Sequence, residues 1–432
     1  MAVVRPFRAV TFSLDSGPDV STRAAPPYDV ISAEQRAAIL AREPHNVVEL
    51  ELPAGAWATA TPDECYRAGA ATWRRWRDEG VLVDDESDAL YLLEQRYTLH
   101  GRPVTRRAII AAVDLEPFSA GVVLPHERTL PKALGDRLAV TRACAANLSQ
   151  VLGLYPDPAG VTDGLLDPVR LGPPMLAAAD PDGVQSLVWA VRDQRRVAGI
   201  AEALAATPIF IADGHHRYTT ALAYRDERRT ADGRVEGDGT SRPYDSIMMA
   251  LVNMDGPELI VLPTHRVADA GKPLDETAFL EGLECRFELM EAPADPTDAL
   301  RDLTAPPTFV VRTRGGRTLI ARLRPDVDVG IDVRVHASRA WKSLDVVVLQ
   351  ELILWPLLGI HPDRPETLER LSFIKNAEEA LAAVKAHDVA FLLRPTRMEQ
   401  LRAVALSGEV MPQKSTYFYP KLLSGLLMRD LA

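Results

Sequence analysis

The chain of 432 residues is long enough to bury a sizeable core and to form two or more domains. Hydrophobic residues make up 47% and charged residues 25%, as in an ordinary soluble globular protein. The formal net charge of -11 disfavours a surface built for nucleic acid or anionic lipid, and three widely separated cysteines predict neither a disulfide framework nor a CxxC metal site.

Targeting and membrane signals are absent from the sequence. The N-terminal residues lack the apolar core of a signal peptide. The longest apolar run, 344–360, carries Asp345, Glu351 and Pro356, so it does not suit a bilayer. We therefore expect a cytoplasmic protein without a membrane partner.

The first 115 residues carry clear signals for helix starts and strands. Ser32 and Gln35 form a capping box, and Thr61-Pro62-Asp63-Glu64 combines a cap, a proline and a first-turn glutamate. The expected elements are strands at 3–12 and 46–52, helices after Ser32 and Thr61, and a hairpin of 89–99 with 104–115.

The rest of the chain mixes helices, strands and hairpins. Regular alternation of strand and helix, as a Rossmann domain requires, is absent, and the order predicts an α+β fold with several hairpins. The expected elements are helices at 135–148, 197–206, 344–354, 398–406 and after Asn376; strands at 150–155, 209–213 and 389–393; a loop-rich excursion at 160–183; and hairpins of 246–253 with 258–262 and of 308–312 with 318–323.

The strongest functional signal is the junction at Asp213-Gly214, where an apolar strand ends and a helix begins. The first amides of a helix lack intrahelical partners and carry the positive end of its dipole, so they suit a phosphate. Gly214 permits close approach, and His215, His216 and Arg217 add donors. The alternative is an ordinary connection, because Asp-Gly is a common turn.

Three other clusters of polar residues follow apolar runs. His126, Glu127 and Arg128 come after Leu124-Pro125; Glu127 is a candidate general base or a magnesium ligand through water, or else the partner of Arg128 in a strand-end ion pair. The second cluster contains His265 and Arg266. In the third, Lys414, Ser415 and Thr416 are candidate phosphate contacts, and Tyr417 could stack on a base or a ring; for both clusters, a surface loop is the alternative. Walker A, HExxH, CxxC and GxSxG motifs are absent, and adjacent histidines are badly spaced for joint metal ligation.

Five blocks of the sequence resemble a widespread prokaryotic family called domain of unknown function 1015. They are PPYDVIS at 26–32, VLPHERTLP at 123–131, ADGHHRYTTAL at 212–222, LPTHRV at 262–267 and MPQKSTYFYPKL at 411–422. The resemblance extends from near residue 1 to residue 428.

A more distant resemblance concerns the PHE and DGHHR motifs, which are similar to those of the ParB/sulfiredoxin-like nucleotide-binding fold. Relatives with that core include CTP-dependent ParB proteins, ATP-dependent sulfiredoxin and kinases of free serine. The resemblance implies a nucleotide-binding core with a mixed sheet at 119–268 and an insertion near 160–183. It also implies an N-terminal α+β region at 1–118 and a C-terminal α/β region at 269–432.

The same resemblance implies a nucleotide-dependent phosphotransferase that uses ATP or ADP, with CTP left open, and Mg²⁺. Its acceptor would be the hydroxyl of a small metabolite such as free serine. The implied roles are catalysis for Glu127, Asp213 and His216; nucleotide or phosphate binding for Gly214, His215, His216, Arg217, Thr129, Lys414, Ser415 and Thr416; the substrate cleft for His126, Arg128, His265, Arg266 and Tyr417; and Mg²⁺ binding for Asp213.

The sequence departs from these relatives in two places. His215 stands where the catalytic cysteine of sulfiredoxin would fall, which disfavours sulfinic acid reduction. The arginine pair of ParB is altered and no helix-turn-helix is evident, so nucleic acid is not an expected partner. A nucleotide-binding regulatory switch without turnover and a ParB-like DNA-associated protein remain alternative functions. Assembly into a homo-oligomer is left open. We expect the blocks at 262 and 411 to close over the Asp213 cleft.

Overall fold

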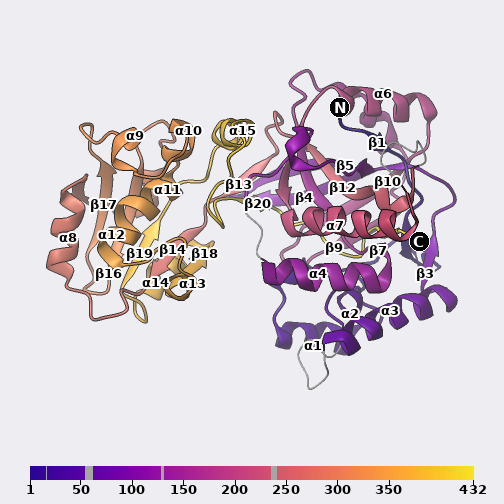
Figure 1. Ribbon diagram of the computed structural model, residues 1–432, viewed down its shortest axis with the longest axis horizontal. Coiled ribbons are helices and arrows are strands. Elements are labelled where there is room, and N and C mark those ends of the chain that lie inside the picture. Colours follow the sequence, from indigo (N-terminus) through magenta and orange to yellow (C-terminus); the bar gives the residue numbers. More distant parts are fainter. Residues whose placement is uncertain (16, 54–61, 128–130, 235–240) are drawn as a thin grey trace. The chain divides into compact units, whose positions relative to one another are not determined.

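A computed structural model describes residues 1–15, 17–53, 62–127, 131–234 and 241–432 (Figure 1). The chain forms two compact units, each considered by itself below. Unit 1 comprises Met1–Pro125, Thr129–Ile260 and Pro420–Ala432, and unit 2 comprises His126–Arg128 and Val261–Tyr419. The three regions expected from the sequence, with boundaries near 118 and 268, stay a prediction.

Unit 1 is built on a mixed sheet, nine-stranded within the described residues. Its path is β6-β11-β8-β12-β5-β4-β10-β9, and β1 pairs with β5. β6 with β11 and β8 with β12 are parallel pairs; the other pairs are antiparallel. The strands are β1 Val4–Arg5, β4 Leu90–Leu99, β5 Arg102–Asp114, β6 Val123–Leu124, β8 Val151–Tyr155, β9 Leu176–Ala179, β10 Gln185–Val191, β11 Ile209–Asp213 and β12 Ser246–Asn253.

The hairpin of β4 and β5 confirms a sequence prediction and shows why the chain reverses there. Leu99 pairs with Arg102, so His100 and Gly101 alone form the loop. Both have positive φ, 49° and 76°. A two-residue loop with two positive φ angles matches the right-handed twist of the flanking strands.

Helices pack on the sheet of unit 1 and complete its core. Val197, Ile200 and Leu204 from α6 and Tyr218 and Ala221 from α7 join the apolar side chains of the strands. α4 contacts α7, and the two helices lie side by side in Figure 1. The helices are α1 Ala33–Arg42, α2 Val48–Glu51, α3 Pro62–Asp78, α4 Pro131–Cys144, α5 Val161–Leu166, α6 Gln194–Ala205 and α7 His215–Ala231, and two small sheets join β2 Val10–Phe12 to β3 Leu82–Asp84 and β7 Ala146–Asn147 to β21 Arg429–Asp430.

Two strand predictions in the N-terminal part are wrong. Residues 46–52 contain the helix α2, because the Asn46 side chain accepts a hydrogen bond from the Val48 amide at 2.9 Å and starts a helical turn in buried surroundings. Residues 3–12 form two strands with different partners; Pro6 between them has no N–H to donate. The Thr61 cap lies outside the described residues, whereas the Ser32 capping box is confirmed.

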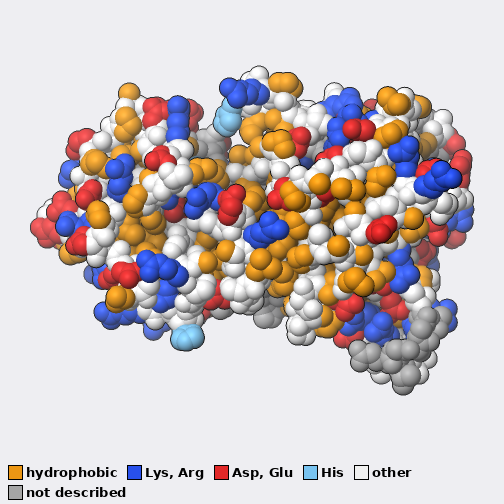
Figure 2. All heavy atoms as spheres, turned by 90° about the horizontal axis from the view of Figure 1, so that it is seen from above, with side chains coloured by type: hydrophobic (Ala, Val, Ile, Leu, Met, Phe, Trp, Pro, Cys, Tyr) orange, Lys and Arg blue, Asp and Glu red, His pale blue; other side chains and the backbone are white. Residues whose placement is uncertain are grey.

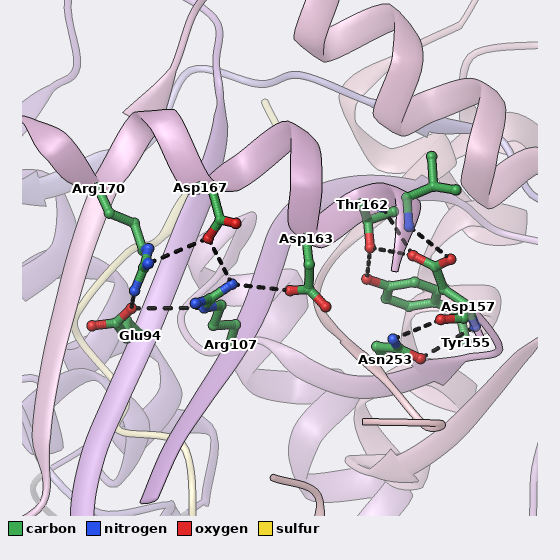
Figure 3. A network of polar contacts seen from close by, with 10 residues as sticks. Glu94, Arg107, Tyr155, Asp157, Thr162, Asp163, Asp167, Arg170 and Asn253 are labelled. Carbon is green, nitrogen blue, oxygen red and sulfur yellow. Dashed lines mark hydrogen bonds and ion pairs between the residues drawn. The ribbon is translucent and has the colours of Figure 1, made fainter. Parts of the chain in front are cut away.

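The expected loop at 160–183 contains regular structure, which is a further correction. Asp157 accepts hydrogen bonds from the amides of Val161 and Thr162 and so begins α5. The 3-10 helix Asp167–Leu171 follows, and then β9. Figure 3 shows that Glu94 on β4 and Arg107 on β5 face this segment, where Arg170 donates to Glu94 at 3.1 Å.

Unit 2 contains an antiparallel sheet, six-stranded within the described residues, in the order β15-β17-β16-β19-β14-β18. Val310 and Ile320 on the predicted hairpin of β16 and β17, with Ala380 on α14, contribute to its core. The strands are β14 His265–Ala268, β15 Phe287–Glu291, β16 Thr308–Thr313, β17 Thr318–Leu323, β18 Leu371–Ile374 and β19 Val389–Leu392, and the helices are α8 Glu276–Glu284, α9 Val329–Asp332, α10 Arg339–Lys342, α11 Asp345–Leu349, α12 Trp355–Leu358, α13 Pro365–Leu368, α14 Ala377–Ala383 and α15 Met398–Leu406.

Two predictions in the second half of the chain need correction. β13 Ile260–Leu262 pairs with β20 Tyr417–Tyr419 rather than forming a hairpin with β12. The helix expected at 344–354 is α-helical over Asp345–Leu349 and π-helical over Gln350–Leu354. The Asn376 cap and the helix at 398–406 are confirmed.

The element order therefore confirms the predicted α+β fold with a mixed sheet. On the face shown in Figure 2, basic and acidic side chains are interspersed, which disfavours that face as a nucleic-acid surface. Among the described helices, none has both the length and the apolar character needed to cross a membrane.

Candidate functional site

The predicted strand–turn–helix junction is present in unit 1. β11 ends at Asp213, Gly214 has a φ of +89°, and α7 begins at His215. The Gly214 amide donates to Asp213 Oδ1 at 2.9 Å. The left-handed backbone at Gly214 lets the strand turn directly into a 17-residue helix, whose N-terminal amides carry the positive end of its dipole.

Arg217 holds its positive charge at this junction. Its guanidinium donates to Ser149 Oγ at 3.2 Å and to the carbonyl oxygen of Gln150. The guanidinium also lies against Gly214, within 3.1 Å of the position that a Cβ atom would occupy. His215, one position into the helix, is buried, and His216 is half-buried.

Asp213 is the carboxylate at the centre of the junction. Lys421 Nζ donates to its Oδ2 at 2.8 Å. Burial raises the pKa of the Asp213 carboxyl, but Lys421 and Arg217 lower it more, so the pKa lies below its ordinary value. Asp213 is therefore ionised at neutral pH.

A further cation, Arg106 on β5, is buried with 1% of its surface exposed. It donates to Gln95 Oε1 at 3.2 Å and to the Pro420 carbonyl oxygen at 2.6 Å. Burial lowers its pKa to about 10, and the charges of Tyr97 and Asp213 oppose that change. Three basic side chains, those of Arg106, Arg217 and Lys421, thus interact electrostatically with the single carboxylate of Asp213. Surplus positive charge at a helix N-terminus suits an anionic ligand.

Glu127 and His126 belong to unit 2, where they meet the block at 411. The Met411 amide donates to the His126 carbonyl oxygen at 2.7 Å. His126 Nε2 lies 2.9 Å from Thr416 Oγ1, and its ring packs edge-on against Phe418. Glu127 Oε1 accepts from the Lys414 amide at 3.1 Å.

The blocks at 262 and 411 meet through Arg266. The buried Arg266 guanidinium donates to the Lys414 carbonyl oxygen at 3.0 Å and lies over the Phe373 ring. Burial lowers the pKa of Arg266 to about 10, and the charge of Glu127 opposes that change. Lys414 itself has a φ of +57° and an exposed side chain.

The remaining predicted residues of unit 2 make internal contacts. His265 Nδ1 accepts from the Leu393 amide at 3.2 Å. Ser415 donates to the Pro412 carbonyl oxygen, and the Tyr417 hydroxyl lies 2.9 Å from Lys375 Nζ. His265 lies on β14 and Tyr417 on β20, so of these three residues only Ser415 belongs to a loop.

The structure groups the predicted residues by unit. Asp213, Gly214, His215, His216 and Arg217 lie together in unit 1, whereas His126, Glu127, His265, Arg266 and 414–417 belong to unit 2. Arg128 and Thr129 lie outside the described residues. That the blocks at 262 and 411 close over the Asp213 cleft stays a prediction.

Sequence reasoning missed Lys421, Arg106 and Gln95 as members of the site. Lys421 stood within the block 411–422, but nothing in the spacing marked it as the partner of Asp213. Gln95 and Arg106 are cross-strand neighbours within otherwise apolar strands. Two buried polar side chains in matching positions of a predicted hairpin were a usable signal, because such groups are seldom buried without a partner.

The described residues provide no ready-made magnesium site. Among them, no group of three or more His, Cys, Asp or Glu side chains could hold a metal ion. Both oxygens of Asp213 are engaged, one by Lys421 and one by the Gly214 amide. Asp213 alone therefore does not fit a magnesium ion in this arrangement.

Several solved structures show a weak likeness to this chain. A free serine kinase in complex with AMP is 14% identical at a TM-score of 0.33, covering 72% of this chain and 86% of that chain. A conserved hypothetical protein from Pyrococcus furiosus is 14% identical at 0.32, covering 75% and 97%, and SbnI with a C-terminal truncation, from Staphylococcus aureus, is 13% identical at 0.34, covering 72% and 84%. TM-scores this low carry no argument about this chain.

No curated protein matches the sequence. Residues 4–347 match the family DUF1015, described as "Protein of unknown function", and the chain belongs to that family.

Proposed function

We propose that the chain is a nucleotide-dependent phosphotransferase that acts on the hydroxyl of a small metabolite, with free serine as the first acceptor to test. The observation that supports it most is the Lys421–Asp213 ion pair at the N-terminus of α7, where the Arg217 guanidinium packs against Gly214. These cations and the helix amides would bind the phosphates of ATP or ADP, and His215 and His216 would add donors.

The proposed reaction needs a group that takes the acceptor proton. Glu127, whose PHE motif resembles that of the free serine kinases, would accept the hydroxyl proton. The acceptor oxygen would form a new bond to the terminal phosphorus while the bond from that phosphorus to the bridging oxygen breaks. ATP would thus leave as ADP, or ADP as AMP.

Magnesium, if bound, would neutralise charge on the transferred phosphate. The described residues hold no metal cluster of their own, so the nucleotide phosphates would supply most of its ligands. Lys414, Ser415 and Thr416 stay candidate phosphate contacts, and His126, His265, Arg266 and Tyr417 stay candidates for the acceptor cleft.

The test is turnover in the intact protein. ATP or ADP is incubated with free serine, other hydroxyl metabolites and Mg²⁺, and phosphorylated product is measured. Glu127→Gln should lower kcat at least about 100-fold while nucleotide affinity stays within about threefold. The matched control is Glu399→Gln on the exposed face of α15, which should keep full activity. Nucleotide binding without turnover on any acceptor would reject the transferase.

One contact favours a second candidate, a nucleotide-binding regulatory switch without turnover. Glu127 Oε1 already accepts the Lys414 amide, which is a structural use of the carboxylate. The switch predicts a nucleotide-dependent change in oligomeric state that Glu127→Gln leaves intact. Sedimentation velocity with and without ADP separates the two candidates.

A further inference from the structure

The segment that follows unit 2 is fastened to the β4–β5 hairpin by two buried side chains. Arg106 donates to the carbonyl oxygen of Pro420 at 2.6 Å. Gln95 Nε2 donates to the carbonyl oxygen of Lys421 at 3.1 Å, and Gln95 Oε1 accepts from Arg106. One linked pair of side chains thus fixes two consecutive peptide groups.

These hydrogen bonds fix the backbone position from which the Lys421 side chain extends. Its backbone is fixed to the hairpin, and its ammonium group reaches Asp213 with 21% of the side chain exposed. An ammonium group has three donors, so it can contact a carboxylate and a phosphate together. Lys421 is therefore placed to bind an anion without leaving Asp213.

A second buried polar side chain lies in the same region. Gln150 is fully buried; its carbonyl oxygen accepts from Arg217, and its Nε2 donates to the Leu423 carbonyl oxygen at 3.5 Å. Its Oε1 has no hydrogen-bond partner among the residues that the structure describes. A buried acceptor left without a donor costs about 1–3 kcal/mol, and a ligand hydroxyl or a water would satisfy it.

We propose that Lys421 is a phosphate-binding residue of unit 1, held at the turn by its contact with Asp213, and that Arg106 and Gln95 are its positioning residues. This inference rests on the proposed function, because it adds a residue to the same phosphate site. It assigns Asp213 to the placement of Lys421 rather than to a metal ion.

The first test compares the affinities of ADP and adenosine by calorimetry in the 432-residue chain. Lys421→Met should weaken ADP binding about tenfold, roughly the value of one charge-assisted contact, and leave adenosine binding unchanged. Lys421→Arg should keep most of the affinity. The matched control is Lys385→Met, which removes an exposed lysine from unit 2 and should change neither affinity.

The outcomes separate this inference from the proposed function. If the wild-type protein binds no nucleotide, the proposed function fails. If it binds ADP and Lys421→Met binds ADP equally well, the inference alone fails. A lower melting temperature with unchanged ADP affinity has the same meaning, because it shows that the ion pair only stabilises the fold.

Gln95→Glu tests the positioning role. It keeps an acceptor for Arg106, with which the new carboxylate would pair, but removes the donor to the Lys421 carbonyl. ADP affinity should fall several-fold while adenosine affinity and the melting temperature hold. Equal loss of both affinities would overturn the positioning role, because it would indicate general damage to the site.

Asp213→Asn tests whether the charge of the Asp213 carboxylate opposes anion binding. Asparagine keeps an oxygen for the Gly214 amide and removes the charge that competes with the ligand. In EDTA, the variant should bind inorganic pyrophosphate more tightly than the wild type. Weaker pyrophosphate binding under these conditions would contradict the inference.

Discussion

The Nε atom of Arg217 lies 2.9 Å from the position that a Cβ atom on Gly214 would occupy. The backbone turn and its cation are thus packed directly against each other. Any side chain at position 214 must displace the guanidinium that donates to Ser149 and Gln150. Gly214 thus determines both the left-handed shape of the turn and the position of the Arg217 guanidinium.

Gly214→Ala should therefore lower the free energy of unfolding by more than a positive φ alone would. Gly233, near the opposite end of α7, has a φ of +63° and nothing within 4 Å of its Cβ position, so Gly233→Ala is the matched control. The control should lose about 1 kcal/mol of unfolding free energy, and Gly214→Ala should lose more. Urea denaturation measures this difference, and equal losses would show that Arg217 moves aside freely. ADP affinity should fall only in Gly214→Ala.

Acid should destabilise unit 2 through His265. Burial and then the charge of Arg266 lower the pKa of His265 to about 4, so the imidazole is neutral in the folded protein and accepts from the Leu393 amide. The unfolded state takes up its proton first, near pH 6.5. Stability from this group is present above that pH and is lost as the pH falls towards 4, by on the order of 3 kcal/mol.

The measurement is urea denaturation from pH 7 to pH 4.5 for the wild type and His265→Asn. Asparagine offers an oxygen to the Leu393 amide and does not titrate, so its curve should be flatter. Parallel curves for the two proteins would reject His265 as the source of the acid sensitivity.

The left-handed backbone at Lys414 predicts an unusual pair of substitutions. Its amide and carbonyl are held by Glu127 and Arg266, so the residue cannot relax to a negative φ without losing both contacts. Lys414→Gly should leave stability unchanged or raise it by up to about 1 kcal/mol, and Lys414→Val should lower it. Thermal unfolding compares the two. A similar loss in both variants would mean that the lysine stem, rather than the backbone, matters.

Glu94 should couple strongly to Arg170 in the network of Figure 3. The Glu94 side chain is 1% exposed and also lies near Arg96 and Arg107. A double-mutant cycle of Glu94→Gln with Arg170→Met should give about 1–2 kcal/mol. The exposed Arg142–Glu227 pair is the control and should give less than about 1 kcal/mol. Equal coupling energies would show that burial of Glu94 adds nothing.

Local signals predicted the junction and most helix starts because their causes lie within a few residues. Ser32, Asn376 and the Asp213-Gly214 turn are of this kind. The alternation of polar and apolar residues at 46–52 was misleading, because a short helix in buried surroundings can bury the same residues as a half-buried strand.

Features that depend on distant partners could not be predicted from local patterns. β13 pairs with β20 far along the chain, and the link from Asp213 to Lys421 joins residues that only the fold brings together. The assignment of Glu127 to the base position came from a family resemblance, and its contact with the Lys414 amide could not be foreseen from spacing.

Unit 1 is discontinuous, and this affects how the protein can be synthesised. The ribosome completes all of Val261–Tyr419 before it reaches Lys421, and Arg429, which donates to Ser246, comes later still. The β4–β5 hairpin and the β11–α7 turn are therefore synthesised before unit 2, whereas Lys421, which contacts both, is synthesised after it. A chain that ends between Arg217 and Lys421 carries Asp213 without its Lys421 partner, so premature termination yields a β11–α7 turn that lacks one of its cations.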